Sequence, residues 1–286
     1  MFGDGGQNRW GKADVYRGKN SLLNAEEMAL NLTFEFTCAN EMMIRSKAFS
    51  DDVALMCLST NDAQLKLHPA YKMAKAGNQN AALELVMDTA LTWLYEQRAR
   101  FAPGLLFVAP HAQEASGDNA IPQTLSSVCA AIYQGCADIE IVQSDRVYHT
   151  GADPMERMAA RAQFVGRVVP GAEYVLVDDV TNLGGTLAEL TNYIQLHSGI
   201  VKGVVVLVNA GRDPQLVPKA KFVQLIKERF DDEFTEVFGI EPGALTANEA
   251  QYLVGFRSVD AIRNRLATAK QEIDRRLRSK GITRSS

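Results

Sequence analysis

The sequence predicts an α/β fold in which a parallel sheet is flanked by helices. After residue 104, short and wholly apolar runs alternate with polar loops and helical patterns. Strands that are apolar throughout are typical of a parallel sheet covered on both faces. The apolar runs are LLFVA (105–109), IEIVQ (139–143), YVLVDDV (174–180) and GVVVLVN (203–209).

Residues 1–60 carry the weakest patterns. Asn24 and Glu27 have the spacing of a capping box, which predicts a short helix at about 25–31 because each side chain can bind an orphan backbone amide. Two alternating stretches, LTFEF (32–36) and VALMCL (53–58), indicate strands.

A helical pattern follows, from Pro69 to Gly77 and from Gln79 to Arg98. In the second helix, apolar residues recur at steps of three and four, which puts them on one face. These residues are Leu83, Met87, Ala90, Leu91 and Leu94.

The connections after residue 104 include two helices and one long polar stretch. The helices are expected at about 123–134 and from Thr186 to His197. The polar stretch, 144–172, is 29 residues long and contains Arg157 and Arg161. A loop of that length is uncommon in a compact domain, so we expect it to act as a lid.

The C-terminal region is predicted to be helical and basic. Thr246 and Glu249 form a second capping box. Residues 257–286 hold nine Lys or Arg against three Asp or Glu, a balance of about +6. An apolar seam at helical spacing runs through them: Val259, Ile262, Leu266, Ala269, Ile273 and Leu277. A basic face is usually solvated, although a protein or nucleic-acid partner for this helix stays open.

These patterns divide the chain into three regions. We expect an additional N-terminal region at 1–100, an α/β core at 101–240 and a C-terminal helical extension at 241–286.

The composition excludes several classes of protein. With 47% hydrophobic and 22% charged residues, the chain is neither disordered nor collagen-like, and a net charge of −4 argues against a basic nucleic-acid binder. No apolar run approaches the ~18 residues of a membrane span. The first residues lack the apolar core of a secretory signal. The four cysteines form no CxxC pair, so we expect reduced thiols in a cytoplasmic protein.

The most informative string runs from Tyr174 to Thr186. An apolar strand ends in two adjacent carboxylates, Asp178 and Asp179, and a turn containing Gly184 and Gly185 leads into a helix. Ligands of open parallel sheets bind at the carboxyl ends of strands. The start of a helix suits a phosphate, because its backbone amides are unpaired and its dipole is positive there. Carboxylates beside such a turn predict a site for a phosphorylated sugar.

This string resembles the signature by which type I phosphoribosyltransferases bind 5-phosphoribosyl-1-pyrophosphate (PRPP). The shared features are four apolar residues, two acidic residues and a turn that ends in Gly-x-Thr. The resemblance covers about residues 100–212 and implies a type I phosphoribosyltransferase-like core, with a hood-like N-terminal addition and a C-terminal helical one.

The resemblance also implies roles for individual residues. Asp178 and Asp179 would bind the ribose hydroxyls, and through them and water they would lie near Mg²⁺, the cofactor of the family. Arg157 and Arg161 would face the pyrophosphate from the lid. The turn would hold the 5′-phosphate, and the loop after the first core strand would hold the pyrophosphate. The turn residues are Asn182, Leu183, Gly184, Gly185 and Thr186, and the loop residues are Ala109, Pro110 and His111.

Two positions depart from the family pattern. Members that act on 6-oxopurines usually have Asp where this chain has Asn182, and an amide cannot serve as a base. Leu183 replaces a small or hydroxyl residue and removes one possible phosphate donor.

Simpler interpretations remain beside these roles. The acid pair could cap a strand end, Arg157 and Arg161 could form a solvated face, and His111 could be a loop histidine without a ligand. A haloacid-type phosphatase would need Asp-x-Asp, which this string lacks.

The resemblance implies a Mg²⁺-dependent phosphoribosyltransferase that uses PRPP and a small nitrogenous acceptor, in nucleotide metabolism. A homodimer is expected because the family commonly forms one. Two alternatives stay open: a PRPP-binding regulatory protein that has lost transfer, and a transferase module within a larger assembly.

Overall fold

The computed structural model describes residues 43–110, 113–114, 117–144, 152–230 and 233–279. Its contacts divide the chain into residues 1–42 and 43–286, and the fold below is that of the second unit. The helix expected at 25–31 and the strand expected at 32–36 lie outside the described residues.

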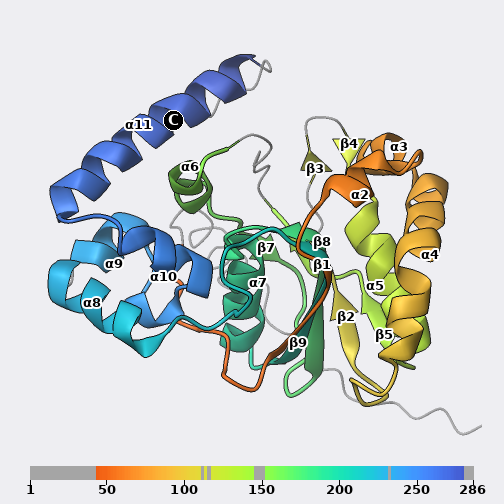
Figure 1. Ribbon diagram of the computed structural model, residues 1–286. Coiled ribbons are helices and arrows are strands. Elements are labelled where there is room, and N and C mark those ends of the chain that lie inside the picture. Colours follow the sequence, from red (N-terminus) through yellow and green to blue (C-terminus); the bar gives the residue numbers. More distant parts are fainter. Residues whose placement is uncertain (1–42, 111–112, 115–116, 145–151, 231–232, 280–286) are drawn as a thin grey trace, which may run out of the picture. The chain divides into compact units, whose positions relative to one another are not determined.

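The centre of this unit is a five-stranded sheet in which all strands are parallel (Figure 1). This confirms the predicted fold class. The strand order is β1-β9-β8-β2-β5. The strands are β1 (Ala54–Ser59), β2 (Leu106–Val108), β5 (Cys136–Asp138), β8 (Glu173–Thr181) and β9 (Ile200–Asn209).

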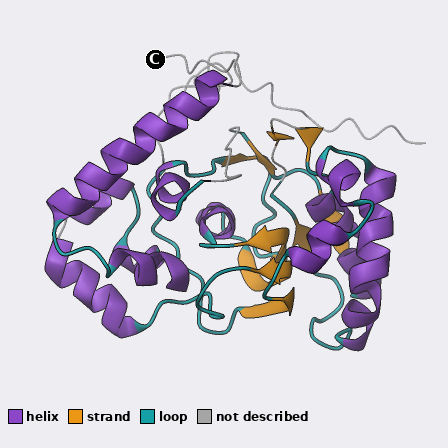
Figure 2. Ribbon diagram, turned by 45° about the horizontal axis from the view of Figure 1, so that its top comes forward, coloured by secondary structure: helices purple, strands orange, loops and turns teal. Residues whose placement is uncertain are grey.

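Helices cover both faces of the sheet (Figure 2). Alternate residues of β8 point to opposite faces, as in any strand. Val175 and Val177 pack with α4 (Gln79–Glu96) and α5 (Ile121–Ile132), while Tyr174 and Leu176 pack with α7 (Gly185–Leu196). All four side chains are fully buried, which explains why the strand is apolar from Tyr174 to Val177.

The buried face of α4 differs from the stripe that the spacing indicates. Ala90 and Leu94 are fully buried, but Leu83 and Met87 are 47% and 41% exposed. The buried face is shifted around the helix and includes Ala82, Leu85 and Val86. Small alanines allow close packing on the sheet, so the larger residues of the pattern do not mark the core side.

The predicted strand at 139–143 is wrong in its position. β5 ends at Asp138, whose Oδ1 accepts hydrogen bonds from the amides of Glu140 and Ile141 at 2.8 and 3.2 Å. This local turn competes with strand pairing, and Ile139 is 80% exposed. β6 (Val142–Gln143) then pairs antiparallel with β7 (Phe164–Val165) in a separate two-stranded sheet.

The polar stretch 144–172 is therefore partly regular structure rather than one long loop. It contains α6 (Pro154–Ala159), which begins after Asp153 because that side chain accepts the Glu156 amide at 3.0 Å. Met155 and Met158 of α6 are buried against C-terminal helices.

The C-terminal helices and α6 form a core of their own. Thr246 and Glu249 form the predicted capping box. In the basic helix, Ile262, Leu266 and Ala269 of the predicted seam are buried. The elements are α8 (Ala220–Phe230), α9 (Glu233–Phe238), the 3₁₀ turn Pro242–Ala244, α10 (Ala247–Leu253) and α11 (Val259–Ser279).

The remaining short elements are α2 (Ala63–Leu67), α3 (Tyr71–Lys75) and the antiparallel pair β3 (Gln113–Glu114) and β4 (Gly117–Asp118). Strand β1 and helix α4 precede residue 100, yet they belong to the sheet and its covering layer. The expected 1–100 region thus contributes directly to the core. None of the helices in the described ranges has the length and apolar character of a membrane span.

Candidate functional site

A pocket of about 250 Å³ lies at the carboxyl end of β8 and the beginning of α7. Besides β8 and α7, residues in or next to α2, α3, β2, α5, β6, α6 and α10 contribute to it. Its lining residues are Asp62, Tyr71, Lys75, Pro110, Asn119, Pro122, Gln143, Arg157, Asp178, Asp179, Val180, Thr181, Asn182, Leu183, Gly184, Gly185, Thr186, Leu187 and Glu249.

The two adjacent carboxylates are held in different ways. Asp179 is 4% exposed, and its Oδ2 lies 2.8 Å from Lys75 Nζ and accepts a hydrogen bond from Asn119 Nδ2 at 3.2 Å. Its Oδ1 accepts the Val180 amide at 2.9 Å. Asp178 is partly buried, and its Oδ1 accepts the Asp179 amide at 2.8 Å.

Burial raises the pKa of Asp178 well above its usual range, and the negative charge of Asp179 raises it further. The charge of Asp179 thus disfavours the ionised form of Asp178, while the Lys75 ammonium partly offsets this effect. A ligand that donates hydroxyl groups or brings a cation would relieve this repulsion. The pair is therefore suited to a polyhydroxylated ligand.

The turn after β8 brings backbone amides to the pocket. Gly184 has φ +80°, a left-handed conformation that glycine adopts without the strain of a side chain, and α7 begins at the next residue. The first backbone amides of α7 have no hydrogen-bond partner within the helix. They belong to residues that line the pocket. This geometry provides an anion site beside the acid pair.

The C-terminal helices support this turn from behind. The Thr246 hydroxyl donates a hydrogen bond of 2.5 Å to the Leu183 carbonyl. A Cβ at Gly184 would lie 3.3 Å from Thr246 Cγ2, and one at Gly185 would lie 3.0 Å from Glu249 Oε1. The capping box of α10 therefore requires small residues in the turn.

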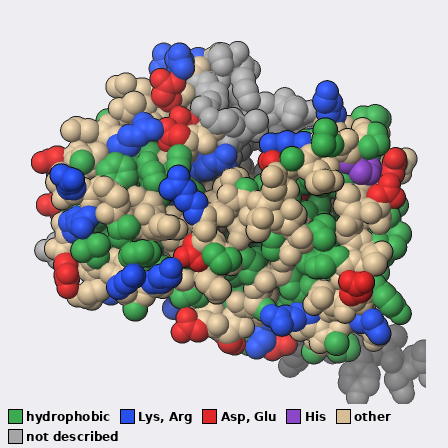
Figure 3. All heavy atoms as spheres, in the orientation of Figure 1, with side chains coloured by type: hydrophobic (Ala, Val, Ile, Leu, Met, Phe, Trp, Pro, Cys, Tyr) green, Lys and Arg blue, Asp and Glu red, His purple; other side chains and the backbone are tan. Residues whose placement is uncertain are grey.

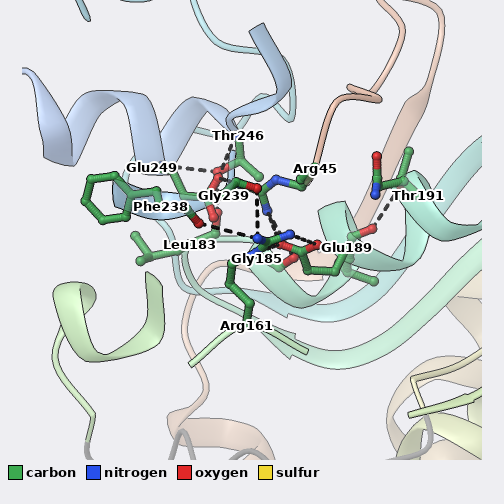
Figure 4. Close-up of polar contacts among 12 residues, drawn as sticks. Arg45, Arg161, Leu183, Gly185, Glu189, Thr191, Phe238, Gly239, Thr246 and Glu249 are labelled. Atoms are coloured by element: carbon green, nitrogen blue, oxygen red, sulfur yellow. Dashed lines mark hydrogen bonds and ion pairs between the residues drawn. The ribbon is translucent and has the colours of Figure 1, made fainter. Parts of the chain in front are cut away.

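A buried network of charges lies beneath the turn (Figure 4). Arg45 is fully buried, and its Nη2 donates to Glu249 Oε2 at 2.5 Å while its Nη1 lies 3.3 Å from Glu189 Oε1. Arg161 donates to both carboxylate oxygens of Glu189, from Nε to Oε1 at 2.7 Å and from Nη2 to Oε2 at 2.8 Å. Two cations and two anions thus compensate one another and connect α7 to α10.

Most of the site residues predicted from sequence lie together in this pocket. They are Pro110, Arg157, Asp178, Asp179, Asn182, Leu183, Gly184, Gly185 and Thr186. Ala109 is buried and does not line the pocket, and His111 lies outside the described residues.

Arg161 requires a correction, because the structure does not place it at the pocket. Its side chain is buried, and besides Glu189 it donates to the carbonyls of Gly239 and Met43, both at 2.8 Å. Arg157, four residues earlier, lies on the pocket side of α6. Arg161 is thus a structural arginine rather than a lid residue.

Several pocket residues come from segments that the sequence interpretation did not connect with the acid pair. Tyr71 and Lys75 belong to α3, and Asp62 precedes α2. No spacing rule relates these short helices to a strand that lies so much later in the chain. Burial raises the pKa of Tyr71, so its hydroxyl stays protonated and able to donate at neutral pH.

The donor set fits Mg²⁺ only when a ligand supplies further oxygens. Carboxylate oxygens are ligands that Mg²⁺ prefers, and the pocket lining includes Asp62, Asp178, Asp179 and Glu249. Across the described ranges, however, no group of three or more Asp, Glu, His or Cys side chains is arranged to hold a metal. Mg²⁺ at this pocket would thus need oxygens from a bound ligand, with Asp178 and Asp179 acting on it only indirectly, through ligand hydroxyls and water.

Comparisons with known proteins complete this description. No family model matches the chain. A protein described as "Protein TraN" from Escherichia coli is 36% identical over 216 residues, which cover 71% of this chain and 47% of TraN. An uncharacterized protein from Haemophilus influenzae is 32% identical over 151 residues, covering 51% of this chain and 33% of that protein. The matches thus span less than half of either relative.

Among solved structures, an adenine phosphoribosyltransferase from Thermoanaerobacter pseudethanolicus aligns with 46% of this chain and 73% of its own, at 17% identity and a TM-score of 0.30. One from Leishmania donovani aligns with 71% and 89%, at 14% identity and a TM-score of 0.33. Likeness at this level carries no inference about activity.

Proposed function

We propose that this chain binds PRPP and, with Mg²⁺, transfers its phosphoribosyl group to a nitrogenous base or related acceptor. The observation that carries this proposal is one pocket in which an acid pair lies beside the amide-rich start of α7. A diol and a phosphate joined by a sugar ring match these two features.

In this proposal, Asp178 and Asp179 accept hydrogen bonds from the ribose 2′- and 3′-hydroxyls. The amides from Asn182 to Thr186 and the Thr186 hydroxyl hold the 5′-phosphate. Pro110 and Arg157, which also line the pocket, lie on the pyrophosphate side. The guanidinium group has a fixed fork of donors suited to phosphate oxygens.

The reaction breaks the bond between ribose C1 and the pyrophosphate oxygen, which leaves with the electron pair. A nitrogen of the acceptor then forms the new bond to C1, and its proton passes to solvent or to a neighbouring base. Positive charge develops on the sugar, so the chain acts mainly by stabilising charge and excluding water. Mg²⁺, when bound, would neutralise the leaving pyrophosphate.

A second candidate is a PRPP-binding regulatory protein without transferase activity. It is favoured by the place of Arg161, which the resemblance would assign to the pyrophosphate and which instead binds Glu189. The packing of α6 against α11 favours it too, since a lid that is docked in this way has less freedom to close.

The deciding experiment has two stages. Calorimetric titration with PRPP and Mg²⁺ should show binding to the wild type, and Asp178→Asn with Asp179→Asn should remove most of the affinity, at ~1.5–3 kcal/mol per charge-assisted hydrogen bond. Lys72→Met, which replaces an exposed lysine, serves as the control. Unchanged affinity in the double variant would contradict the assignment of the pocket.

The second stage is a pyrophosphate-release assay with PRPP, Mg²⁺ and a panel of bases. Release that depends on one acceptor supports the transferase, while binding without release for any base supports the regulatory protein. We expect hypoxanthine and guanine to be poor acceptors, because Asn182 cannot take the proton of a 6-oxopurine. General base assistance is typically worth ~10²–10⁴-fold.

A further inference from the structure

A lysine from outside the phosphoribosyltransferase-like signature binds the acid pair across the pocket. Lys75 is the last residue of α3, and its Nζ lies 2.8 Å from Asp179 Oδ2. The lysine side chain is 25% exposed and that of Asp179 is 5% exposed, so the ion pair is largely shielded from water.

This ion pair occupies Oδ2, one of the two carboxylate oxygens that Asp179 could offer to a ribose hydroxyl. Asp179 Oδ2 also accepts a hydrogen bond from Asn119 Nδ2 at 3.2 Å. A carboxylate oxygen has about two acceptor positions, so two donors fill the capacity of Oδ2. A sugar diol can reach this oxygen only if one of the two donors leaves.

The fold fixes the backbone that carries Lys75 and the side chain of Asn119. Ala74 is fully buried, and its carbonyl accepts the Ala120 amide at 3.1 Å, which ties the end of α3 to the start of α5. Asn119, beside it, accepts the Ile121 amide at 3.2 Å through its own Oδ1. Lys75 is the donor able to move, because it is a flexible four-carbon side chain.

We propose that Lys75 determines specificity by exchanging partners: it holds Asp179 in the empty pocket and transfers to the pyrophosphate when PRPP binds. This inference rests on the proposed PRPP binding. Ribose 5-phosphate carries the same diol and 5′-phosphate but has no group to receive the ammonium. It would therefore have to displace a shielded cation without compensation. The pocket thus selects a pyrophosphorylated sugar over the monophosphate.

The test compares Lys75→Met with Lys72→Met, a matched substitution of an exposed lysine on the same short helix. Each variant and the wild type are titrated by calorimetry with PRPP and with ribose 5-phosphate, both with Mg²⁺. We expect Lys75→Met to weaken PRPP binding about ten- to hundredfold, the loss of one charge-assisted contact, and to leave ribose 5-phosphate binding equal or tighter. Lys72→Met should change neither affinity.

The outcomes separate this inference from the function on which it rests. A Lys75→Met variant that weakens both ligands by the same factor, or that keeps the wild-type preference, overturns the exchange. Lys75→Arg retains the positive charge, so it should retain the preference for PRPP over ribose 5-phosphate. A folded Lys75→Arg variant without this preference would also overturn the exchange. A wild type that binds both ligands equally overturns the exchange but leaves the pocket assignment intact. A wild type that binds neither overturns the proposed function and this inference together.

Discussion

At the scale of single residues, the fold buries ionisable side chains in and beneath the pocket, where water cannot fully solvate their charge. Asp178 is a carboxyl group whose pKa is raised by burial and by Asp179, and Arg45 is a fully buried cation. Such groups persist only where neighbouring structure holds them, and they are concentrated at functional sites. The raised pKa of Asp178 is therefore consistent with the binding role proposed for the acid pair.

Asp178→Asn should stabilise the empty protein at neutral pH. A carboxyl group with a raised native pKa contributes its full stability below the unfolded value, about pH 4, and loses it as the pH rises through the native pKa. The amide does not ionise, so the variant should melt at a higher temperature near pH 7. The difference should narrow towards pH 4. Thermal unfolding across this pH range checks the prediction, and a variant that melts below the wild type at pH 7 contradicts it.

At the scale of elements, the turn into α7 is determined from both sides. The strand β8 delivers the acid pair, and the capping box of α10 supports the turn through Thr246 and Glu249. The turn into α7 can thus bind an anion beside the acid pair only because β8 and α10 hold it in place. A helix N-terminus alone would be a common feature, whereas a helix N-terminus with an acid pair in the same pocket is specific.

Gly184→Ala should weaken phosphate binding more than it weakens the fold. The alanine must keep the positive φ of Gly184, which costs roughly 1–2 kcal/mol for a residue with a side chain. Its Cβ would also lie 3.3 Å from Thr246 Cγ2. Gly104→Ala is the matched control, because Gly104 has φ +90° with nothing within 4 Å. Both variants should lose similar stability in urea, and Gly184→Ala should lose PRPP affinity in addition. Equal affinities in the two variants would remove the turn from the site.

Arg161→Ala should destabilise the protein strongly. It leaves Glu189 buried with Arg45 alone at 3.3 Å, and breaking a buried ion pair in this way costs about 3–5 kcal/mol. Arg157→Ala, on the pocket side of α6, should change the free energy of unfolding by less than about 1 kcal/mol and lower PRPP affinity. Denaturant unfolding and calorimetry measure the two effects. If the two variants exchange these behaviours, the lid role returns to Arg161.

At the scale of the whole unit from residue 43 onwards, two apolar cores cover the sheet and a third joins α6 to the C-terminal helices. The network of Arg45, Arg161, Glu189 and Glu249 connects the third core to the sheet layers. Arg265 of α11 forms an ion pair with Asp153 before α6. Lys and Arg side chains gather mainly over α8–α11 on the face drawn in Figure 3, with acidic groups among them. This mixture is that of a solvated surface.

Ile262→Ala should destabilise the sheet as well as α11. The side chain is 2% exposed, and truncating a buried isoleucine costs about 2–5 kcal/mol. Because the buried network joins the cores, we expect circular dichroism and the fluorescence of Trp93 in α4 to report one transition, in a Trp10→Phe background. Ile139→Ala, at an 80% exposed position, should leave the midpoint unchanged. Two separate transitions would show that the C-terminal core unfolds alone.

The sequence by itself determined the features whose residues are neighbours in the chain. One continuous string contains the apolar strand, the acid pair, the glycine turn and the start of α7, so local rules located them. The capping box of α10 was predicted from the spacing of Thr246 and Glu249 alone. The C-terminal seam was predicted in the same way, through Ile262, Leu266 and Ala269.

Only the tertiary structure decided which distant residues meet this string. Lys75 reaches Asp179 because α3 is tied to α5, and Thr246 reaches Leu183 because α10 packs on the turn. Arg157 and Arg161 have the same chemistry and lie four residues apart, yet one lines the pocket and the other is buried against Glu189. A charged side chain can be satisfied by solvent, ligand or a buried partner. Which of these applies depends on long-range packing, which no local spacing encodes.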